Sequence, residues 1–443
     1  MSPKLISVVA FSALASGTAA QTCPEASIVL FGQDAVDRFP AVYVDCDRIA
    51  GNLIVRSDPD SAAVTDLSPL GSLIEIDGSF LLDPDPENPD RSNRGLTALT
   101  GLERLERVGR DLKIRGTDSL RTLAGLAGLR EVGGTLELTS NRGLQRLSGL
   151  DSLRRVGGDL FIGFSPELSD LAGLGSLDSI GGDLNLQLLN GLGALSGADR
   201  LRAVGGDLKL FSHPRLASVA GLGRLNSVGG HLRIADCDAL PALDGLSSLT
   251  TVGDGLSLSD LPSLVDLDGL ASLTDVGGPL TVRETALLTS LEGLAAVDAA
   301  SISQLTLDDN PALETCTLRN LCAFAVEAPV DSLSITGGVG PCGSTQDFVA
   351  ECRRVVPTDD VNDDDAGLTL YPNPSRGDLY VDADAAGGLS VAVYDARGRA
   401  VARLEVSGGR LDLRSLPAGL YALTFAFDAG GQRPAQRLVQ LAD

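Results

Sequence analysis

The sequence predicts an all-β protein: a β-solenoid of leucine-rich repeats, each about 24 residues long, followed by a small C-terminal β-sandwich. A Val-Gly-Gly-Asp-Leu-like phrase recurs with its first Gly at positions 109, 133, 157, 181, 205, 229, 253 and 277. Such regular spacing is the signature of stacked repeats, each of which buries its apolar residues against its neighbours. Residues 368–443 instead alternate apolar and polar residues between Gly, Pro and Asp turns, which is typical of antiparallel strands.

One repeat, residues 136–158, shows the expected local structure. Leu136 and Leu138 flank a polar residue, which predicts a short strand with one inward face. Leucines then follow at every third position, which favours tight helical turns over a long helix. We expect Gly157 and Gly158 to supply the sharp turn into the next strand at positive φ. Stacking at about 4.8 Å per rung would bury every one of these leucines.

A ladder of inward residues is expected three positions past each strand. It is made of Thr117, Asn141, Ser165, Leu189, His213, Cys237, Leu261, Thr285 and Asn310. A polar side chain there can bond the amides of adjacent rungs. Cys237 and His213 are therefore expected to be buried ladder residues and not a reactive thiol or a catalyst. His231 takes the place that Asp holds in other repeats.

The ends of the chain predict export. Lys4, an apolar run over 5–15 and small residues at 18–20 are typical of a secretory signal, and no later segment is apolar enough to span a membrane. The predicted domains are a signal peptide (1–20), an N-terminal cap (21–50), the repeat solenoid (51–310), a Cys-containing C-terminal cap (311–356), an acidic linker (357–367) and a C-terminal domain (368–443).

Six of the seven cysteines lie in the two predicted caps, as expected for disulfides in an exported protein. Cys23 and Cys46 form the simplest pair. Cys316, Cys322, Cys342 and Cys352 allow three connectivities. A zinc site is disfavoured because these four lack paired C-x-x-C spacing.

The charge excludes one class of function. With 35 Lys and Arg against 59 Asp and Glu, the formal net charge is −24, whereas nucleic-acid binding requires clustered basic residues. Residues 21–356 carry −20, the linker carries −5, and residues 368–443 are neutral. The chain has only two histidines and no linear motif for a nucleophile, a zinc protease or a phosphate loop. No cofactor is expected.

Two sets of outward residues are candidates for binding. The residue between the two strand leucines points outward, and on this basis Phe161, Phe211, Lys209 and Arg233 form a candidate aromatic and basic patch for a protein or an anionic glycan. Scattered surface residues without a partner are the alternative. Asp159, Asp183 and Asp207 are weak calcium candidates, because they would stack in consecutive rungs, although each is more simply a turn residue that bonds local amides.

The repeats resemble the receptor L-domain branch of leucine-rich-repeat-like proteins. The resemblance rests on repeated segments such as 126–134, with Leu126, Leu129, Val132, Gly133 and Gly134, and on the sequences that flank the repeats at 33–39 and 301–311. It covers residues 23–356 and implies a right-handed β-solenoid. It does not imply a particular ligand, because the scaffold serves many partners.

Residues 368–443 resemble the C-terminal sorting domain of the type IX secretion system. The matching residues are Tyr371, Pro372, Asn373, Pro374 and Gly377, then Asp395 and Gly398, then Pro417, Gly419 and Tyr421. The resemblance implies recognition by the outer-membrane export machinery and delivery to the cell surface or the medium. Deleting 368–443 should leave the protein in the periplasm.

The sequence as a whole predicts a secreted or cell-surface, non-enzymatic binding or adhesion protein. The alternative is a β-helix polysaccharide lyase or hydrolase exported by the same route, because such an enzyme could use Asp and Arg without a linear motif. The near-uniform repeats and the absence of Trp, a favoured platform for sugar stacking, weigh against it.

Overall fold

The chain divides into two units, residues 1–356 and 357–443. The computed structural model describes residues 22–23, 27–57, 62–83, 93–356, 368–371, 378–383, 389–395, 399–406, 410–427 and 435–441. The predicted signal peptide, the acidic linker and the loop at 84–92 lie outside the described residues.

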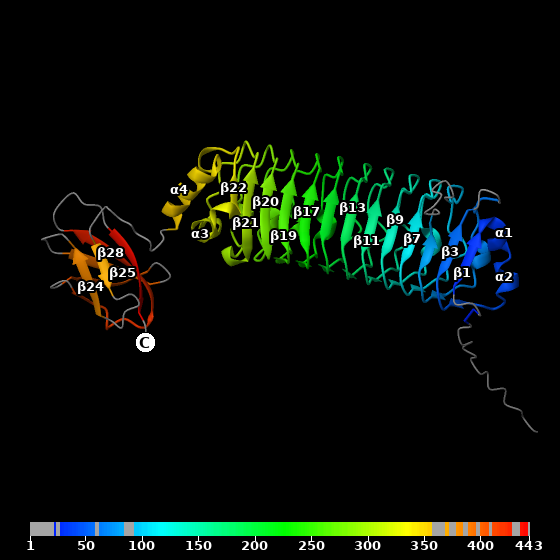
Figure 1. Cartoon of the computed structure of the whole chain (residues 1–443), viewed down its shortest axis with the longest axis horizontal. Coiled ribbons are helices and arrows are strands. Elements are labelled where there is room, and N and C mark those ends of the chain that lie inside the picture. Colours follow the sequence, from blue (N-terminus) through cyan, green and yellow to red (C-terminus); the bar gives the residue numbers. More distant parts are fainter. Residues whose placement is uncertain are drawn as a thin grey trace, which may run out of the picture. The chain divides into compact units, whose positions relative to one another are not determined.

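A long parallel sheet runs through the first unit (Figure 1). Its thirteen described strands follow chain order: β1 (Ile28–Phe31), β3 (Leu53–Arg56), β5 (Phe80–Leu82), β7 (Leu112–Arg115), β9 (Leu136–Thr139), β11 (Leu160–Gly163), β13 (Leu184–Gln187), β15 (Leu208–Phe211), β17 (His231–Ala235), β19 (Gly255–Ser259), β20 (Gly278–Arg283), β21 (Ile302–Asp308) and β22 (Leu333–Ile335). Equivalent residues of successive repeats pair directly, as Leu160 does with Leu184. The predicted repeat is therefore one rung of a β-solenoid.

A second parallel sheet lies opposite the first, and the sequence did not predict it. Its nine described strands have two residues each: β2 (Arg48–Ile49), β4 (Glu75–Ile76), β6 (Arg107–Val108), β8 (Glu131–Val132), β10 (Arg155–Val156), β12 (Ser179–Ile180), β14 (Ala203–Val204), β16 (Ser227–Val228) and β18 (Thr251–Val252). Strands this short show no alternation of their own. They form only because the rungs stack in register, as Val156 does against Ile180.

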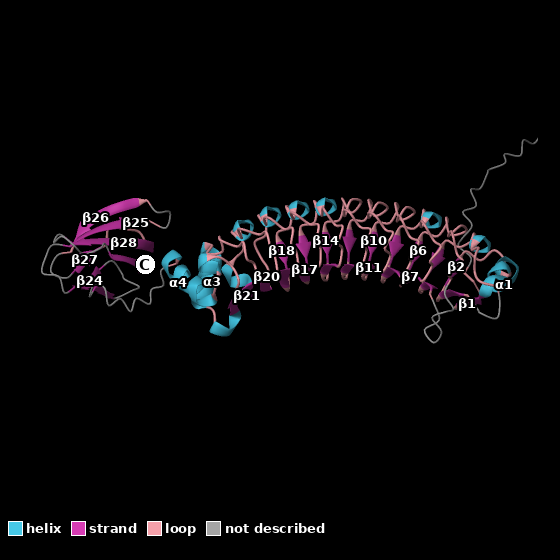
Figure 2. Cartoon of the chain, turned by 90° about the horizontal axis from the view of Figure 1, so that it is seen from above, coloured by secondary structure: helices cyan, strands magenta, loops and turns pink. Residues whose placement is uncertain are grey.

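Short 3-10 turns connect the two sheets, as the three-residue leucine spacing predicts. Those of the repeats are η1 (Ser68–Leu70), η2 (Ala124–Leu126), η3 (Ala220–Leu222), η4 (Asp244–Leu246), η5 (Asp268–Leu270) and η6 (Glu292–Leu294). Three more, η7 (Ala299–Ser301), η8 (Val330–Ser332) and η9 (Gly340–Cys342), lie near the C-terminal end. The rungs follow a gentle curve, with the long sheet on the concave side (Figure 2).

The inward leucines form one continuous core, and the predicted ladder is buried within it. Asn141 Nδ2 donates to the carbonyl of Ile114 (2.8 Å), and its Oδ1 accepts from the Thr117 amide (3.0 Å). Asn310 makes the equivalent bonds to Val282 and Thr285. The ladder thus bonds one rung to the previous one, as expected.

The reason for the Gly pair differs from the prediction. Neither Gly157 nor Gly158 has positive φ. Instead, a Cβ added to Gly157 would lie 2.2 Å from the carbonyl oxygen of Gly133 in the previous rung, so glycine is required for close stacking. Positive φ occurs one residue after the strand, at Ser140 and its equivalents in other rungs, where only the β7 rung has a glycine, Gly116.

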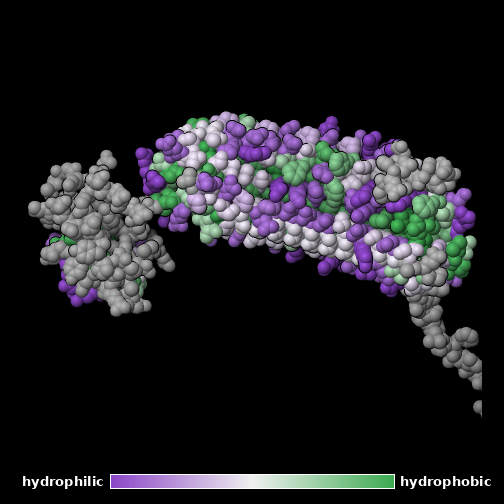
Figure 3. Space-filling model, viewed as in Figure 1, coloured by the Kyte–Doolittle hydropathy of each residue, from purple (hydrophilic) through white to green (hydrophobic). Residues whose placement is uncertain are grey.

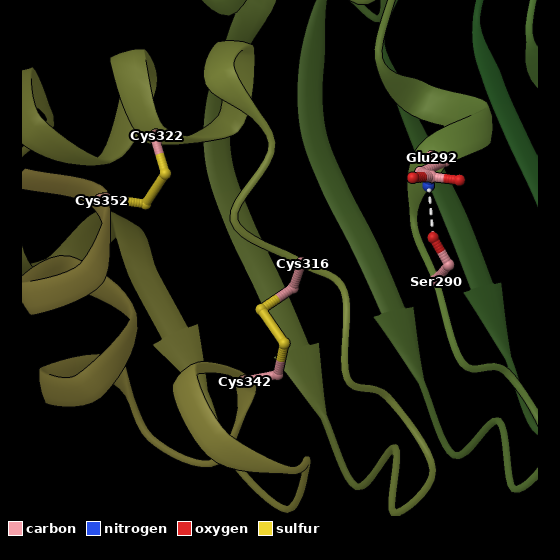
Figure 4. The surroundings of a disulfide bond; sticks show 6 residues. All are labelled: Ser290, Glu292, Cys316, Cys322, Cys342 and Cys352. Atoms are coloured by element: carbon pink, nitrogen blue, oxygen red, sulfur yellow. Dashed lines mark hydrogen bonds between the residues drawn. A yellow bond between two sulfur atoms is a disulfide. The ribbon is translucent and has the colours of Figure 1, made fainter. Parts of the chain in front are cut away.

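Both ends of the first unit contain helices and disulfides, and the long sheet extends into both predicted caps. Helices α1 (Gly32–Asp37) and α2 (Phe39–Val42) follow β1, and α3 (Arg319–Glu327) and α4 (Thr345–Val355) flank β22. The long sheet thus has strands on either side of residues 51–310, and the protein is mostly but not entirely β. Cys23 pairs with Cys46, as expected. In the C-terminal cap, Cys316 pairs with Cys342 and Cys322 with Cys352 (Figure 4), which is one of the three open connectivities.

The second unit consists of two antiparallel sheets. One contains β23 (Leu368–Tyr371), β24 (Asp378–Ala383) and β27 (Arg410–Asp412). The other contains β25 (Leu389–Tyr394), β26 (Ala400–Glu405), β28 (Gly419–Phe427) and β29 (Ala435–Leu441). Buried residues of both sheets, such as Leu379 and Phe425, share one core, as expected for a small β-sandwich.

Candidate binding face and sorting domain

The concave face of the long sheet carries columns of outward side chains. Because the strands pair in register, the residue after each first strand leucine stacks on its equivalent in the next rung, as Lys209 does on Arg233. Figure 1 looks onto this face, and Figure 3 shows it with apolar surface over the middle rungs and at the β1 end, separated by hydrophilic surface.

In the rungs of β5, β7 and β9, here named the ion-paired rungs, outward charged side chains form ion pairs with one another. Arg115 Nε donates to Glu137 Oε1 (2.6 Å), and Arg115 Nη2 donates to Glu137 Oε2. Arg115 Nη1 lies 3.3 Å from Asp83 Oδ2. Hydrogen bonding to Glu137 raises the pKa of Arg115, and burial raises the pKa of Asp83. Glu137 is only 8% exposed, so it is less available than its outward position predicts.

The three calcium candidates bond the backbone of the following rung. Asp159 Oδ1 accepts from the Asp183 amide, Asp183 Oδ1 from the Asp207 amide, and Asp207 Oδ1 from the His231 amide, each at 2.8 Å. Lys209 Nζ lies 2.9 Å from Asp183 and 2.8 Å from Asp207. These bonds account for the carboxylates without a metal, and no group of three or more metal-ligating side chains occurs in the part of the chain that the structure describes.

A shallow hollow of about 310 Å³ lies over β15 to β20. Its lining is Phe211, His231, Arg233, Ala235, Gly255, Leu256, Ser257, Ser259, Pro279 and Thr281. The structure thus brings two of the four predicted patch residues, Phe211 and Arg233, into one site. Phe161 and Lys209 lie outside the lining. The Lys209 ammonium is already held by two aspartates, whereas Arg233 has no hydrogen-bond or ion-pair partner among the described residues.

Two further exposed apolar residues, Phe164 and Leu188, follow β11 and β13 and were not predicted from the sequence. The Leu188 amide donates to the carbonyl of Phe211, which lines the hollow (3.0 Å), and Phe164 lies one rung further along. Phe164 and Leu188 are 44% and 40% exposed, and their φ values are 54° and 53°. Other rungs place Gly, Ser, Asp or Glu at this left-handed position. A left-handed backbone costs a residue with a side chain about 1 kcal/mol. The available signal was a large apolar residue at a repeat position that is otherwise small or polar.

We name Phe161, Phe164, Leu188 and Phe211, together with the lining of the hollow, the candidate binding face. Beneath it the inward ladder is incompletely bonded. His213 is fully buried, its Nε2 donates to the carbonyl of Leu186 (3.1 Å), and its Nδ1 has no partner in the described structure. Burial lowers the pKa of His213 to about 4 and raises the pKa of Cys237 to about 12. Both residues are buried ladder members, as predicted.

The motif residues of the second unit stabilise its turns where they are described. Tyr421 is buried, and its hydroxyl donates to the carbonyl of Pro417 (2.9 Å). Asp395 accepts from the Arg399 amide (3.0 Å) and forms an ion pair with its guanidinium (2.8 Å). Residues 372–377 and Gly398 lie outside the described residues, and of Tyr371 only the backbone is described, at the end of β23.

Comparison with known proteins identifies this second unit. The family described as Secretion system C-terminal sorting domain matches residues 369–439. The chain therefore carries a type IX secretion sorting domain, and the protein is exported to the cell surface or the extracellular space. No curated protein matches the chain. Across the described residues, no helix has the length and apolar character needed to cross a membrane.

Proposed function

We propose that this exported protein is a non-enzymatic binding or adhesion protein, and that its ligand docks on the candidate binding face. In this proposal the first unit is a right-handed, receptor L-domain-like leucine-rich-repeat solenoid that the sorting domain delivers to the cell exterior. Two long parallel sheets with one leucine-filled core support that assignment. Solenoids of this kind use their concave surfaces for recognition.

One observation carries the binding proposal. Phe164 and Leu188 expose large apolar side chains from left-handed backbone positions. The Leu188 amide donates to the carbonyl of Phe211 (3.0 Å), a residue of the hollow, and in the same hollow Arg233 has no partner among the described residues. The two left-handed positions cost stability locally, and large apolar side chains are not needed there to stack the rungs, because other rungs use small or polar residues. Side chains retained at such a cost are typical of functional surfaces.

The chemistry of the hollow supports binding over glycoside hydrolysis. Hydrolases of glycosidic bonds use a pair of carboxylates on either side of the bond. The lining of the hollow offers a guanidinium, an imidazole, three hydroxyls and apolar side chains, and it contains no carboxylate. The arrangement suits the capture of a ligand that carries polar groups.

The test is a screen of the full-length protein against immobilised cell-surface glycans and cell-surface proteins. The triple variant Phe164→Ser, Leu188→Ser and Phe211→Ser should lose at least tenfold in affinity for whichever ligand the wild type binds. The double variant Leu287→Ser and Val265→Ser is the matched control, because these residues are comparably exposed (52% and 45%) and lie outside the binding face. Thermal melts verify that both variants fold.

Three results would contradict the proposal. The first is a triple variant that binds as tightly as the control, which would exclude this face. The second is a wild type that binds nothing in the screen. The third is the release of shortened products from a bound glycan, which would favour the lyase or hydrolase alternative.

A further inference from the structure

The hollow over β15 to β20 has the chemistry of a site for one acidic sugar. We infer that it binds a single carboxylate- or sulfate-bearing sugar unit of a glycan that is otherwise neutral. This inference rests on the proposed function, and it names the class of ligand for that same face.

The first argument is the unused charge of Arg233. On the ion-paired rungs Arg115 is bonded to Glu137 and Asp83, and on β15 Lys209 is bonded to Asp183 and Asp207. Among the described residues Arg233 has no such partner. A guanidinium presents a planar fork of donors that matches the oxygens of a carboxylate or a sulfate, so Arg233 is built to hold one anion.

Two of the acids near the hollow, Asp207 and Asp236, have partners other than Arg233. Asp207 is occupied by the Lys209 ammonium (2.8 Å) and by the His231 amide (2.8 Å). Asp236 accepts from the Ser212 hydroxyl (3.0 Å). His231 adds an imidazole to the same lining.

The rest of the lining favours a sugar over a peptide. Ser257, Ser259 and Thr281 offer hydroxyls that can exchange hydrogen bonds with sugar hydroxyls, and Phe211 and Pro279 offer apolar surface for the carbon–hydrogen face of a ring. At about 310 Å³ the hollow is at the lower limit for ligand sites, which suits one ring. Extended peptides are recognised largely through main-chain hydrogen bonds, but the strand backbone here is already bonded within the parallel sheet.

The overall charge limits how acidic the glycan can be. Residues 21–356 carry a formal charge of −20, so a polyanion is repelled over distances up to about 8 Å, the Debye length at physiological salt. One acidic unit on a neutral chain gains the contact with Arg233 and meets little of that repulsion. Raising the salt concentration should therefore weaken its binding only slightly.

The test is calorimetric titration of the full-length protein with defined probes. Sialyllactose and a xylotriose bearing one glucuronic acid carry one carboxylate, and a monosulfated lactose carries one sulfate. Lactose and unsubstituted xylotriose are the neutral counterparts, and polygalacturonate is the polyanion. We expect at least one singly charged probe to bind tenfold or more tightly than its neutral counterpart and more tightly than polygalacturonate per acidic unit. The carboxylate and sulfate arms separate the two sources of the anion.

Arg233→Ala should remove the tenfold preference for the acidic probe, and Arg233→Lys should restore part of it. Arg283→Ala is the matched control, because Arg283 lies on the same face at β20 and outside the hollow. The inference is overturned if no singly charged probe outbinds its neutral counterpart, if Arg233→Ala keeps the preference, or if the screen finds only protein ligands. A ligand that depends on Phe164 and Leu188 but not on Arg233 would overturn this inference and leave the proposed function standing.

Discussion

Two regions of the same concave face differ in how they use an outward arginine. In the ion-paired rungs Arg115 is bonded to Glu137 and Asp83, so its charge serves the fold. A few rungs further on, Arg233 has no partner among the described residues and lines a hollow. The repeat is the same in both regions, and so is the sheet. The difference shows that the repeat places an arginine on the outward face, whereas acidic residues in the neighbouring rungs determine whether its guanidinium is already ion-paired.

The same contrast continues inside the solenoid. Beneath the ion-paired rungs Asn141 bonds both a carbonyl and an amide of the previous rung. Beneath the binding face the equivalent position is His213, whose Nδ1 has no partner within the described structure. The rungs under the binding face are thus less completely bonded both outside and inside. A solenoid tolerates this because every rung is also held by its two neighbours.

The largest expected effect is a loss of stability in acid that is caused by His213, which lies beneath the candidate binding face. Its folded pKa is about 4, and an unfolded histidine titrates near 6.5. Between these values the unfolded chain binds more protons, so the contribution of His213 is complete above about pH 6.5 and falls by about 3 kcal/mol as the pH drops to about 4. His213→Asn should remove this fall. Urea unfolding of both proteins at pH 7 and pH 4.5 measures the difference, and identical pH dependence would contradict it.

Arg115→Ala should give the next largest effect. The change removes the guanidinium that bonds both Glu137, which is 8% exposed, and Asp83, and it leaves Glu137 only the more distant Lys113 ammonium (4.0 Å). It should lower the free energy of unfolding by about 2 kcal/mol. The replacement should not weaken ligand binding, because Arg115 lies outside the binding face. Denaturant titration and the calorimetric assay measure the two properties. A loss below 0.5 kcal/mol would mean that this pairing does not stabilise the rungs.

Replacing Phe164 or Leu188 with Gly should stabilise the protein. Gly116 already occupies this position in the rung of β7, at φ 64°. Relief of the left-handed strain should raise the free energy of unfolding by about 0.5–1 kcal/mol for each replacement, while ligand affinity falls. A thermal melt and a binding titration of the same variant test whether stability rises while affinity falls. A destabilised variant would show that these side chains serve packing and not recognition.

Arg233→Ala should have the smallest effect on stability, within about 0.5 kcal/mol of the wild type, because no partner among the described residues is lost. It is the counterpart of Arg115→Ala: we expect Arg115 to contribute to the stability of the fold and Arg233 to ligand binding. If the two variants destabilised the protein equally, the distinction between the two regions would fail.

Much of the candidate site could be expected from the repeat. The period placed Phe211 and Arg233 on the outward face and His213 and Cys237 in the core, and the structure agrees. The period could not predict that the Lys209 ammonium forms ion pairs with aspartates, because one of these partners, Asp183, belongs to the previous rung. Nor could it predict the left-handed backbone of Phe164, since the residue at this turn is not a glycine.

By itself, the sequence determined the rung length, the inward leucines, the polar ladder and the sorting domain, because each depends on residues that recur at fixed spacing or form one local motif. Only the tertiary structure decided the two-residue strands of the second sheet, the close contact that makes the Gly pair necessary, and the charges left unpaired on the concave face. These depend on distances between atoms of different rungs. Such distances exist only once the rungs are stacked.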